Sequence, residues 1–302
     1  MPALATTSGF PNDTTLRGIH MIVYQAWSQR EPVGRKIFNV YDSDQIREHS
    51  LTFGGLGIMT QKAEGAAVDY TSPVEGFLNT YTHTVFASAV RITMEQWADD
   101  LYNVMEDQPA ELGRAAYATE ETTLANHFNN GFDSGVTGAD GVELFSTAHV
   151  REDGATYANE LSTAADLSTT SLEQALIDFR NQRDGGGKRL SIKPETLLVP
   201  PDLQFAAVRI LDSSQTPEDN TNAVQPISGL GLTLQVWDYL TNTDDWFVCA
   251  AKENHKLNLY ERASFATSDI LDFDTGDVKI KGLFRQSSGW ADPRGLFGSP
   301  GA

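Results

Sequence analysis

The side chains best suited to catalysis in this sequence are its histidines, which could act as the base of a serine or cysteine hydrolase. Such an enzyme needs a nucleophile held beside that base. No Gly-x-Ser-x-Gly segment, the turn that presents a nucleophilic serine, occurs in the chain. The histidines show no paired spacing: they are His20, His49, His83, His127, His149 and His255. We therefore predict no catalytic residue and expect each histidine to be a surface group or a hydrogen-bonded core group.

Metal and phosphate sites are weakly supported as well. There is no His-Glu-x-x-His segment, and the single cysteine, Cys249, excludes a zinc site built from several thiolates. Asp272–Asp277 begins like a calcium loop, but Gly276 stands at the third ligand position and Leu283 at the closing glutamate position. Gly185–Lys188 lacks the earlier glycine and the following hydroxyl residue of a phosphate-binding loop. Both segments are predicted to be turns, and no metal or cofactor is expected.

Acidic residues dominate the charge of the chain. Lysine and arginine number 22 against 41 aspartate and glutamate residues, which gives 22 − 41 = −19. A surface of this sign repels phosphate, so a protein that reads DNA is disfavoured. One acidic run is expected to form a solvated helix face: Glu106, Asp107, Glu111, Glu120 and Glu121.

The 302 residues, 40% of them hydrophobic, are enough for one large domain or two smaller ones with a substantial core. A single cysteine allows no intrachain disulfide, and Cys249 lies in an apolar run typical of a small buried side chain. No apolar stretch approaches the roughly 18 residues of a membrane span, so no membrane partner is expected. The first residues show no signal-peptide pattern.

The first quarter of the chain is predicted to be slender. Residues 1–47 carry many Gly, Pro, Asn and Asp residues without a sustained helical period, which indicates an extended arm. Residues 48–80 read as a long glycine-rich hairpin with its tip at Lys62–Gly65 and a return strand starting at Ala67–Tyr70. Such a hairpin is marginal alone in water. Its partner is expected to be another copy of the chain.

The rest of the chain mixes helices and strands. Residues 80–92 are rich in strand-forming residues, and Thr93 with Gln96 forms a capping-box pattern for the helix that follows. A second helix is predicted from Pro109 to about Asn130, and a third is expected to be capped by Ser171. Further strands are predicted at Thr196–Val199, Leu230–Val236, Trp246–Ala250, Leu257–Tyr260 and Val278–Arg285.

Several short segments, taken in order, resemble the major capsid proteins of tailed phages, including the Mu-like major head subunit group. They are Lys62–Gly65 with Tyr81–Thr84, Leu144–His149, Leu197–Pro201 and Asp245–Val248. The resemblance runs over most of the chain, and Leu144–His149 followed by Leu198–Pro201 is its most specific part.

This resemblance implies the Hong Kong 97-type fold, an α+β fold with an N-terminal arm, an extended β-hairpin loop, a peripheral domain with a long spine helix, and an axial α/β domain. Laid over the sequence pattern, it places the arm at 1–47, the extended loop at 48–80, the peripheral domain at 81–139 and 262–302, and the axial domain at 140–261.

The resemblance also implies a structural protein rather than an enzyme. Copies of it would form hexamers and pentamers of an icosahedral shell around double-stranded DNA, bound without sequence specificity. Separate scaffold, portal and decoration proteins are possible partners, and the virion, assembled in the host cytoplasm, is the expected location. The residues expected to contact neighbouring subunits are Trp27, Leu51, Phe53, Lys62 and Glu64.

Two alternatives stay open at the level of sequence. An encapsulin-like compartment shares the implied fold and would enclose a cargo enzyme instead of DNA. A soluble acidic hydrolase would have to assemble its active site from residues far apart in the chain.

Overall fold

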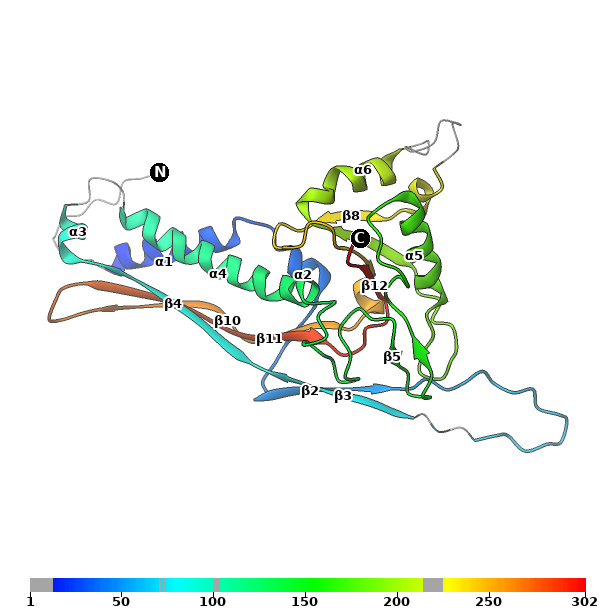
Figure 1. Ribbon diagram of the computed structural model, residues 1–302. Coiled ribbons are helices and arrows are strands. Elements are labelled where there is room, and N and C mark those ends of the chain that lie inside the picture. Colours follow the sequence, from blue (N-terminus) through cyan, green and yellow to red (C-terminus); the bar gives the residue numbers. More distant parts are fainter. Residues whose placement is uncertain (1–12, 71, 73, 100–103, 214–224) are drawn as a thin grey trace.

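A long, twisted sheet and a shorter second sheet form the framework of the protein (Figure 1). The computed structural model describes residues 13–70, 72, 74–99, 104–213 and 225–302. The long sheet has the strand order β1-β10-β11-β4, and the second sheet has the order β12-β9-β7-β8. In the part of the chain so described, no helix combines the length and the apolar character that crossing a bilayer requires.

The long sheet is built around one hairpin, β10 (Leu257–Leu271) and β11 (Val278–Trp290). β4 (Thr84–Ile92) pairs with β11 in antiparallel orientation, and the short β1 (Asn39–Asp42) pairs with β10 in parallel. The hairpin turn is the acidic segment 272–277, where Asp272 Oδ2 pairs with Lys279 Nζ at 2.6 Å. The prediction of a turn there is confirmed, and β11 is longer than the sequence pattern suggested.

Helix α1 (Asp13–Ser28) corrects the expectation that residues 1–47 lack a helix. Its buried face, which includes Ile19 and Val23, packs on the spine helix and on the long sheet. Burying a side chain such as Val23 contributes about 1.5–3 kcal/mol. This gain lets a polar, glycine-containing segment fold on its own chain. The short α2 (Val33–Ile37) follows and also lies against the spine helix.

The spine helix, α4 (Val104–Asn129), runs along the long sheet toward the second sheet (Figure 1). It begins five residues before the predicted start, so Pro109 lies inside the helix and not at its first position. Pro109 is the sixth residue of the helix, so its missing N–H costs one hydrogen bond to the carbonyl four residues earlier. The preceding α3 (Met94–Ala98) has the predicted capping box of Thr93 and Gln96.

The second sheet lies between two apolar clusters. Its strands are β7 (Pro194–Val199), β8 (Thr233–Val236), β9 (Trp246–Ala250) and β12 (Leu296–Ser299). One face packs on the carboxyl end of α4, and the other packs on α5 (Thr169–Asn181) and α6 (Gln204–Asp212). Cys249 is buried as predicted. The strand at one edge of the second sheet, β12, is the last strand of the described chain. The division of the chain into domains stays a prediction.

Minor elements complete the fold. A two-stranded ladder pairs β5 (His149–Val150) with β6 (Thr156–Tyr157), and short 3-10 turns span Pro201–Leu203, Ile227–Leu230 and Lys252–Asn254. β8 covers only the second half of the predicted strand at 230–236.

The predicted hairpin at 48–80 is present, but its strands are short. β2 (Arg47–Phe53) pairs with β3 (Glu75–Thr82) in antiparallel orientation. The predicted return strand at Ala67–Tyr70 is wrong, since these residues have no regular structure. β3 and β4 are separated at His83, whose buried ring lies 3.1 Å from Ser43 Oγ and 3.0 Å from Ser287 Oγ.

Helix α5 begins three residues earlier than the sequence suggested. Ser168 caps the helix: its hydroxyl accepts a hydrogen bond from Ser171 N at 3.2 Å, and Ser171 Oγ accepts one from Ser168 N at 2.9 Å. The predicted buried face, which includes Leu172 and Phe179, is confirmed.

Replacing Ser168 with alanine should lower the free energy of unfolding by about 1 kcal/mol, because the Ser171 N–H at the start of the helix loses its side-chain acceptor. Urea denaturation followed by circular dichroism measures this change. The exposed Ser162, exchanged for alanine in the same way, should change stability by less than about 0.5 kcal/mol. Equal effects of the two exchanges would contradict the assigned cap.

Candidate assembly surfaces

Several strongly exposed apolar side chains lie on the segment between β2 and β3, here called the projecting loop (residues 54–70). Figure 1 shows this segment leaving the body of the molecule. Ile58, Met59 and Tyr70 are 81%, 95% and 99% exposed. Ala66 N donates to Ala63 O at 3.2 Å, and Gly65 has a φ of 78°. The turn is therefore at the predicted tip, and no residue that the structure describes covers the side chains of Ile58, Met59 and Tyr70.

The predicted contact residues divide into two groups. Leu51 and Phe53 on β2 are exposed, as are Lys62 and Glu64 near the loop tip. Trp27 instead packs within its own chain, where its ring lies 5.5 Å from that of Phe265. The structure thus gives Trp27 an intramolecular partner, and the other four stay predicted contacts.

Sequence reasoning overlooked the loop residues with the largest exposed apolar surface. They are Leu56, Ile58, Met59, Val68 and Tyr70. The signal was present, because these residues stand among glycines and polar residues with neither a period-2 nor a helical pattern. Large apolar side chains in a segment without periodicity have no local face to share, which favours a partner outside the segment.

Two further apolar surfaces lie away from the loop. A groove of about 260 Å³ between α4, β4 and β11 is lined by Phe86, Leu112, Phe265 and Phe284, among others. At the turn between β10 and β11, Phe273 is 98% exposed and Ile270 64%. Exposed apolar surfaces at several separate places suit a protein that contacts more than one partner.

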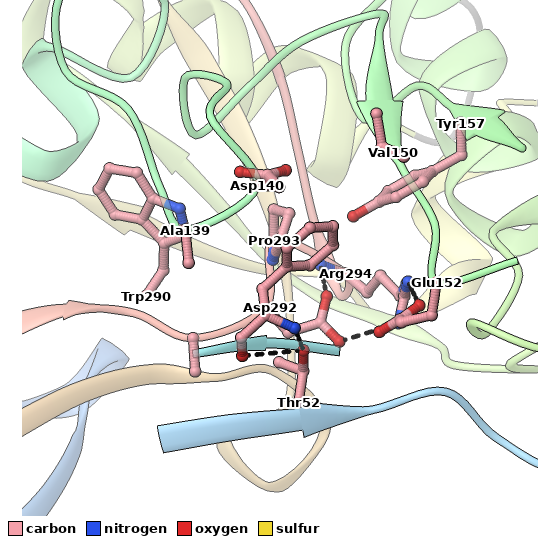
Figure 2. A pocket seen from close by; sticks show the side chains of 12 residues that line it. Thr52, Ala139, Asp140, Val150, Glu152, Tyr157, Trp290, Asp292, Pro293 and Arg294 are labelled. Carbon is pink, nitrogen blue, oxygen red and sulfur yellow. Dashed lines mark hydrogen bonds and ion pairs between the residues drawn. The ribbon is translucent and has the colours of Figure 1, made fainter. Parts of the chain in front are cut away.

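The root of the projecting loop meets the rest of the chain at a small polar pocket (Figure 2). Its lining includes Thr52, Glu152, Tyr157, Asp292 and Arg294. Arg294 Nη2 donates to Glu152 Oε2 at 2.7 Å, and Arg294 Nη1 lies 3.2 Å from Asp292 Oδ2. Burial raises the pKa of Asp292 and of the Tyr157 hydroxyl. Because charged groups are costly to bury without partners, this pocket fixes side chains instead of leaving room for a ligand.

The spine helix carries two buried carboxylates, which corrects the prediction of a fully solvated acidic face. Glu106, Asp107 and Glu111 are exposed, but Glu120 and Glu121 are only 6% and 1% exposed. The predicted face therefore covers only the amino-terminal half of α4.

Each buried carboxylate has specific partners. Glu120 Oε1 accepts from Arg35 Nε at 2.5 Å, and Arg35 Nη2 also pairs with Glu261 Oε1 at 2.5 Å. Glu121 accepts hydrogen bonds from Gly34 N at 3.1 Å and from Trp237 Nε1 at 2.7 Å. Burial raises the pKa of both carboxyls, and these partners oppose the rise. The cluster joins α2, α4, β10 and Trp237, which directly follows β8.

Two of the histidines have hydrogen-bonding partners in the fold, and the cysteine is buried. His149 Nδ1 lies 2.6 Å from Asp140 Oδ2, and His127 Nε2 lies 2.8 Å from Ser288 Oγ. Burial raises the pKa of the Cys249 thiol to about 12. Among the residues that the structure describes, no three His, Cys, Asp or Glu side chains are grouped so that they could hold a metal ion.

Comparison with known proteins relates this chain to a protein family. A family model described as phage capsid protein matches residues 78–298. The Mu-like prophage FluMu major head subunit of Haemophilus influenzae is 35% identical over 74 residues, which is 24% of this chain and 24% of that protein. The match thus spans about a quarter of that relative's length.

Solved structures extend the likeness to the whole fold. The capsid structure of the cyanophage P-SCSP1u aligns with a TM-score of 0.62 at 13% identity, over 90% of this chain and 89% of that one. The bacteriophage JBD30 capsid aligns with a TM-score of 0.56 at 15% identity, over 80% of this chain and 99% of that one. The predicted α+β fold of the Hong Kong 97 type is confirmed. Together with the family model, which covers most of its length, this fold shows that the chain belongs to the phage capsid protein family.

Proposed function

We propose that this protein is the major capsid protein of a tailed phage and that its copies form the hexamers and pentamers of an icosahedral shell around double-stranded DNA. Family membership and the capsid fold support this role. The observation that carries it is the projecting loop, whose Ile58, Met59 and Tyr70 are 81–99% exposed. An isolated subunit would leave these side chains in water, and a second copy would cover them.

The energetics favour such an assembly. Burying apolar surface contributes about 25 cal/mol per Å2, so several hundred Å2 of loop surface offset part of the entropy lost on association. The loop and the groove at Phe86 and Leu112 are different surfaces of the same chain. Contacts between unlike surfaces are heterologous, and they close into rings when the rotation between copies allows it.

The charge of the chain suits a container for DNA. A net charge of −19 repels phosphate, so DNA would be enclosed without sequence-specific binding. We propose a structural and non-enzymatic role in the virion, with assembly in the host cytoplasm. Separate scaffold, portal and decoration proteins would complete the particle. One similar structure, from bacteriophage JBD30, is of a capsid decorated with minor capsid protein trimers.

Exchanging Ile58, Met59 and Tyr70 together for serine should abolish or strongly reduce particle formation, while the unfolding free energy of the subunit changes by less than about 0.5 kcal/mol. These side chains are almost fully exposed among the described residues, so mainly contacts with other copies are lost. Electron microscopy and sedimentation of the expressed protein measure assembly.

The matched control exchanges Gln61, Ala63 and Ala67 for serine, which changes the same exposed loop but removes little apolar surface. This control should assemble like the wild type. Wild-type protein that stays a small monomer under every scaffold condition would contradict the proposed function, and normal particles from the Ile58, Met59 and Tyr70 variant would exclude the loop as an assembly surface.

A further inference from the structure

The two chain segments at the base of the projecting loop pass through a narrow space, in which an added side chain at either glycine would be crowded. A Cβ atom on Gly54 would lie 3.1 Å from Glu152 Cβ and 3.3 Å from Val74 O. One on Gly76, across the hairpin, would overlap Thr52 Oγ1 and lie 3.1 Å from Glu152 Cγ. Real Cβ atoms rarely come this close to other atoms. The aliphatic part of Glu152 therefore packs on both segments of the loop root.

A turn from a distant part of the sequence closes the same space from another side. A Cβ atom on Gly185 would overlap Glu152 Oε2 and lie 2.7 Å from Gly54 Cα, and one on Gly186 would lie 2.5 Å from Gly55 O. The turn is itself fixed, because Asp184 Oδ1 accepts hydrogen bonds from Gly186 N at 3.1 Å and Lys188 N at 2.8 Å. Backbone packs directly on backbone here, without intervening side chains.

Arg294 holds Glu152 in place. The Glu152–Arg294 ion pair at 2.7 Å is almost fully buried, with side-chain exposures of 2% and 8%. The Arg294 guanidinium also lies 5.3 Å from the centre of the Tyr157 ring and contacts Asp292, as Figure 2 shows for these side chains. A buried pair with several partners has one favoured geometry. The position of Glu152 against the loop root is thus set by residues far from the loop in sequence.

We propose that Glu152, Arg294 and the turn Asp184–Gly187 form a clamp that fixes the direction in which the projecting loop leaves the subunit. This inference rests on the proposed function for its purpose, because a loop that must meet a matching surface on another copy has to leave the body at a defined angle. The clamp residues are positioning residues: they lie at the loop root and act through the backbone of Gly54, Gly55 and Gly76.

The test compares two glycine-to-alanine exchanges in the full-length chain. Gly185→Ala places a methyl group against Glu152 and the Gly54 backbone, whereas Gly57→Ala, in the projecting loop, meets no atom within 4 Å. Hydrogen exchange with mass spectrometry should show about tenfold faster exchange around the Gly54 amide, which donates to Val74 O, in Gly185→Ala only. Equal exchange in the two folded variants would overturn the clamp.

A second variant covers the case that Gly185→Ala does not fold. Glu152→Gln keeps the shape of the side chain and removes the charge that pairs with Arg294, so it should speed exchange at the loop root in the same direction. Unchanged exchange in this variant would also overturn the clamp. These measurements compare amides within one subunit, so they decide the clamp even if the wild-type chain forms no shell, a result that would refute only the proposed function.

Discussion

Replacing Arg35 with alanine should lower the free energy of unfolding by about 3–5 kcal/mol, one of the two largest effects that we expect from a single exchange. Arg35 pairs with both Glu120 and Glu261, whose side chains are 7% and 13% exposed. Without the guanidinium, two carboxylates remain close together in a poorly solvated place. Urea denaturation at pH 7 measures the change.

Lowering the pH should reduce the loss of stability that Arg35→Ala causes. Burial already raises the pKa of Glu120, and Arg35 opposes that rise, so the exchange should raise the pKa further. A carboxyl whose pKa is higher in the folded than in the unfolded state binds more protons when folded, and its stability contribution falls as pH rises above the unfolded value of about 4.3. The penalty of Arg35→Ala should therefore be smaller at pH 5 than at pH 7.

The neighbouring Lys36 supplies the control. It pairs with Glu31 at 2.9 Å, but the two side chains are 45% and 76% exposed. Lys36→Ala should cost less than about 1 kcal/mol at either pH, because exposed ion pairs contribute little. Similar losses for the two variants would show that the buried cluster does not hold α2, α4 and β10 together.

Acidification from pH 7 to pH 4 should destabilise the wild type through His127 by about 2–3 kcal/mol. Burial lowers the pKa of His127 to about 4, and its ring lies between Phe38 and Trp290. In the unfolded chain the pKa is about 6.5. The neutral folded form is thus favoured at pH 7, and this stability is lost progressively as pH falls through 6.5 toward 4.

The exchange His127→Gln isolates this contribution. Glutamine can still approach Ser288 Oγ, which the His127 ring contacts at 2.8 Å, but it does not titrate. The difference between the stabilities at pH 7 and pH 4 should shrink by about 2–3 kcal/mol in this variant. In the control Gln61→Ser, which removes no titrating group, the difference should stay as in the wild type. An unchanged difference in His127→Gln would mean that the imidazole is not the group responsible.

Local sequence patterns predicted the parts of the fold in which neighbours along the chain decide the outcome. The capping box at Thr93 and the buried run at Thr196–Val199 are confirmed, as is the turn at Lys62–Gly65. The cap at Ser168 was misplaced by three residues because Ser168 and Ser171 share one chemistry, and only the observed backbone tells which residue precedes the helix.

Contacts between residues distant in sequence determine the parts of the structure that local patterns did not predict. Arg35 lies 85 positions from Glu120, and Arg294 lies 142 positions from Glu152. No local pattern distinguishes Glu120 and Glu121, which are buried, from Glu111, which is exposed, because burial depends on what packs over the helix.

The sequence by itself determined the family resemblance, the α+β class, the excess of negative charge and a glycine-rich loop that lacks a local apolar face. Only the tertiary structure decided that α1 folds on the spine helix, that Trp27 has a partner in its own chain, and that Ile58, Met59 and Tyr70 have none in the described core. The physical reason is that secondary structure and turns follow from short-range sterics and hydrogen bonding. Burial and ion pairing follow instead from which distant segments the fold brings together.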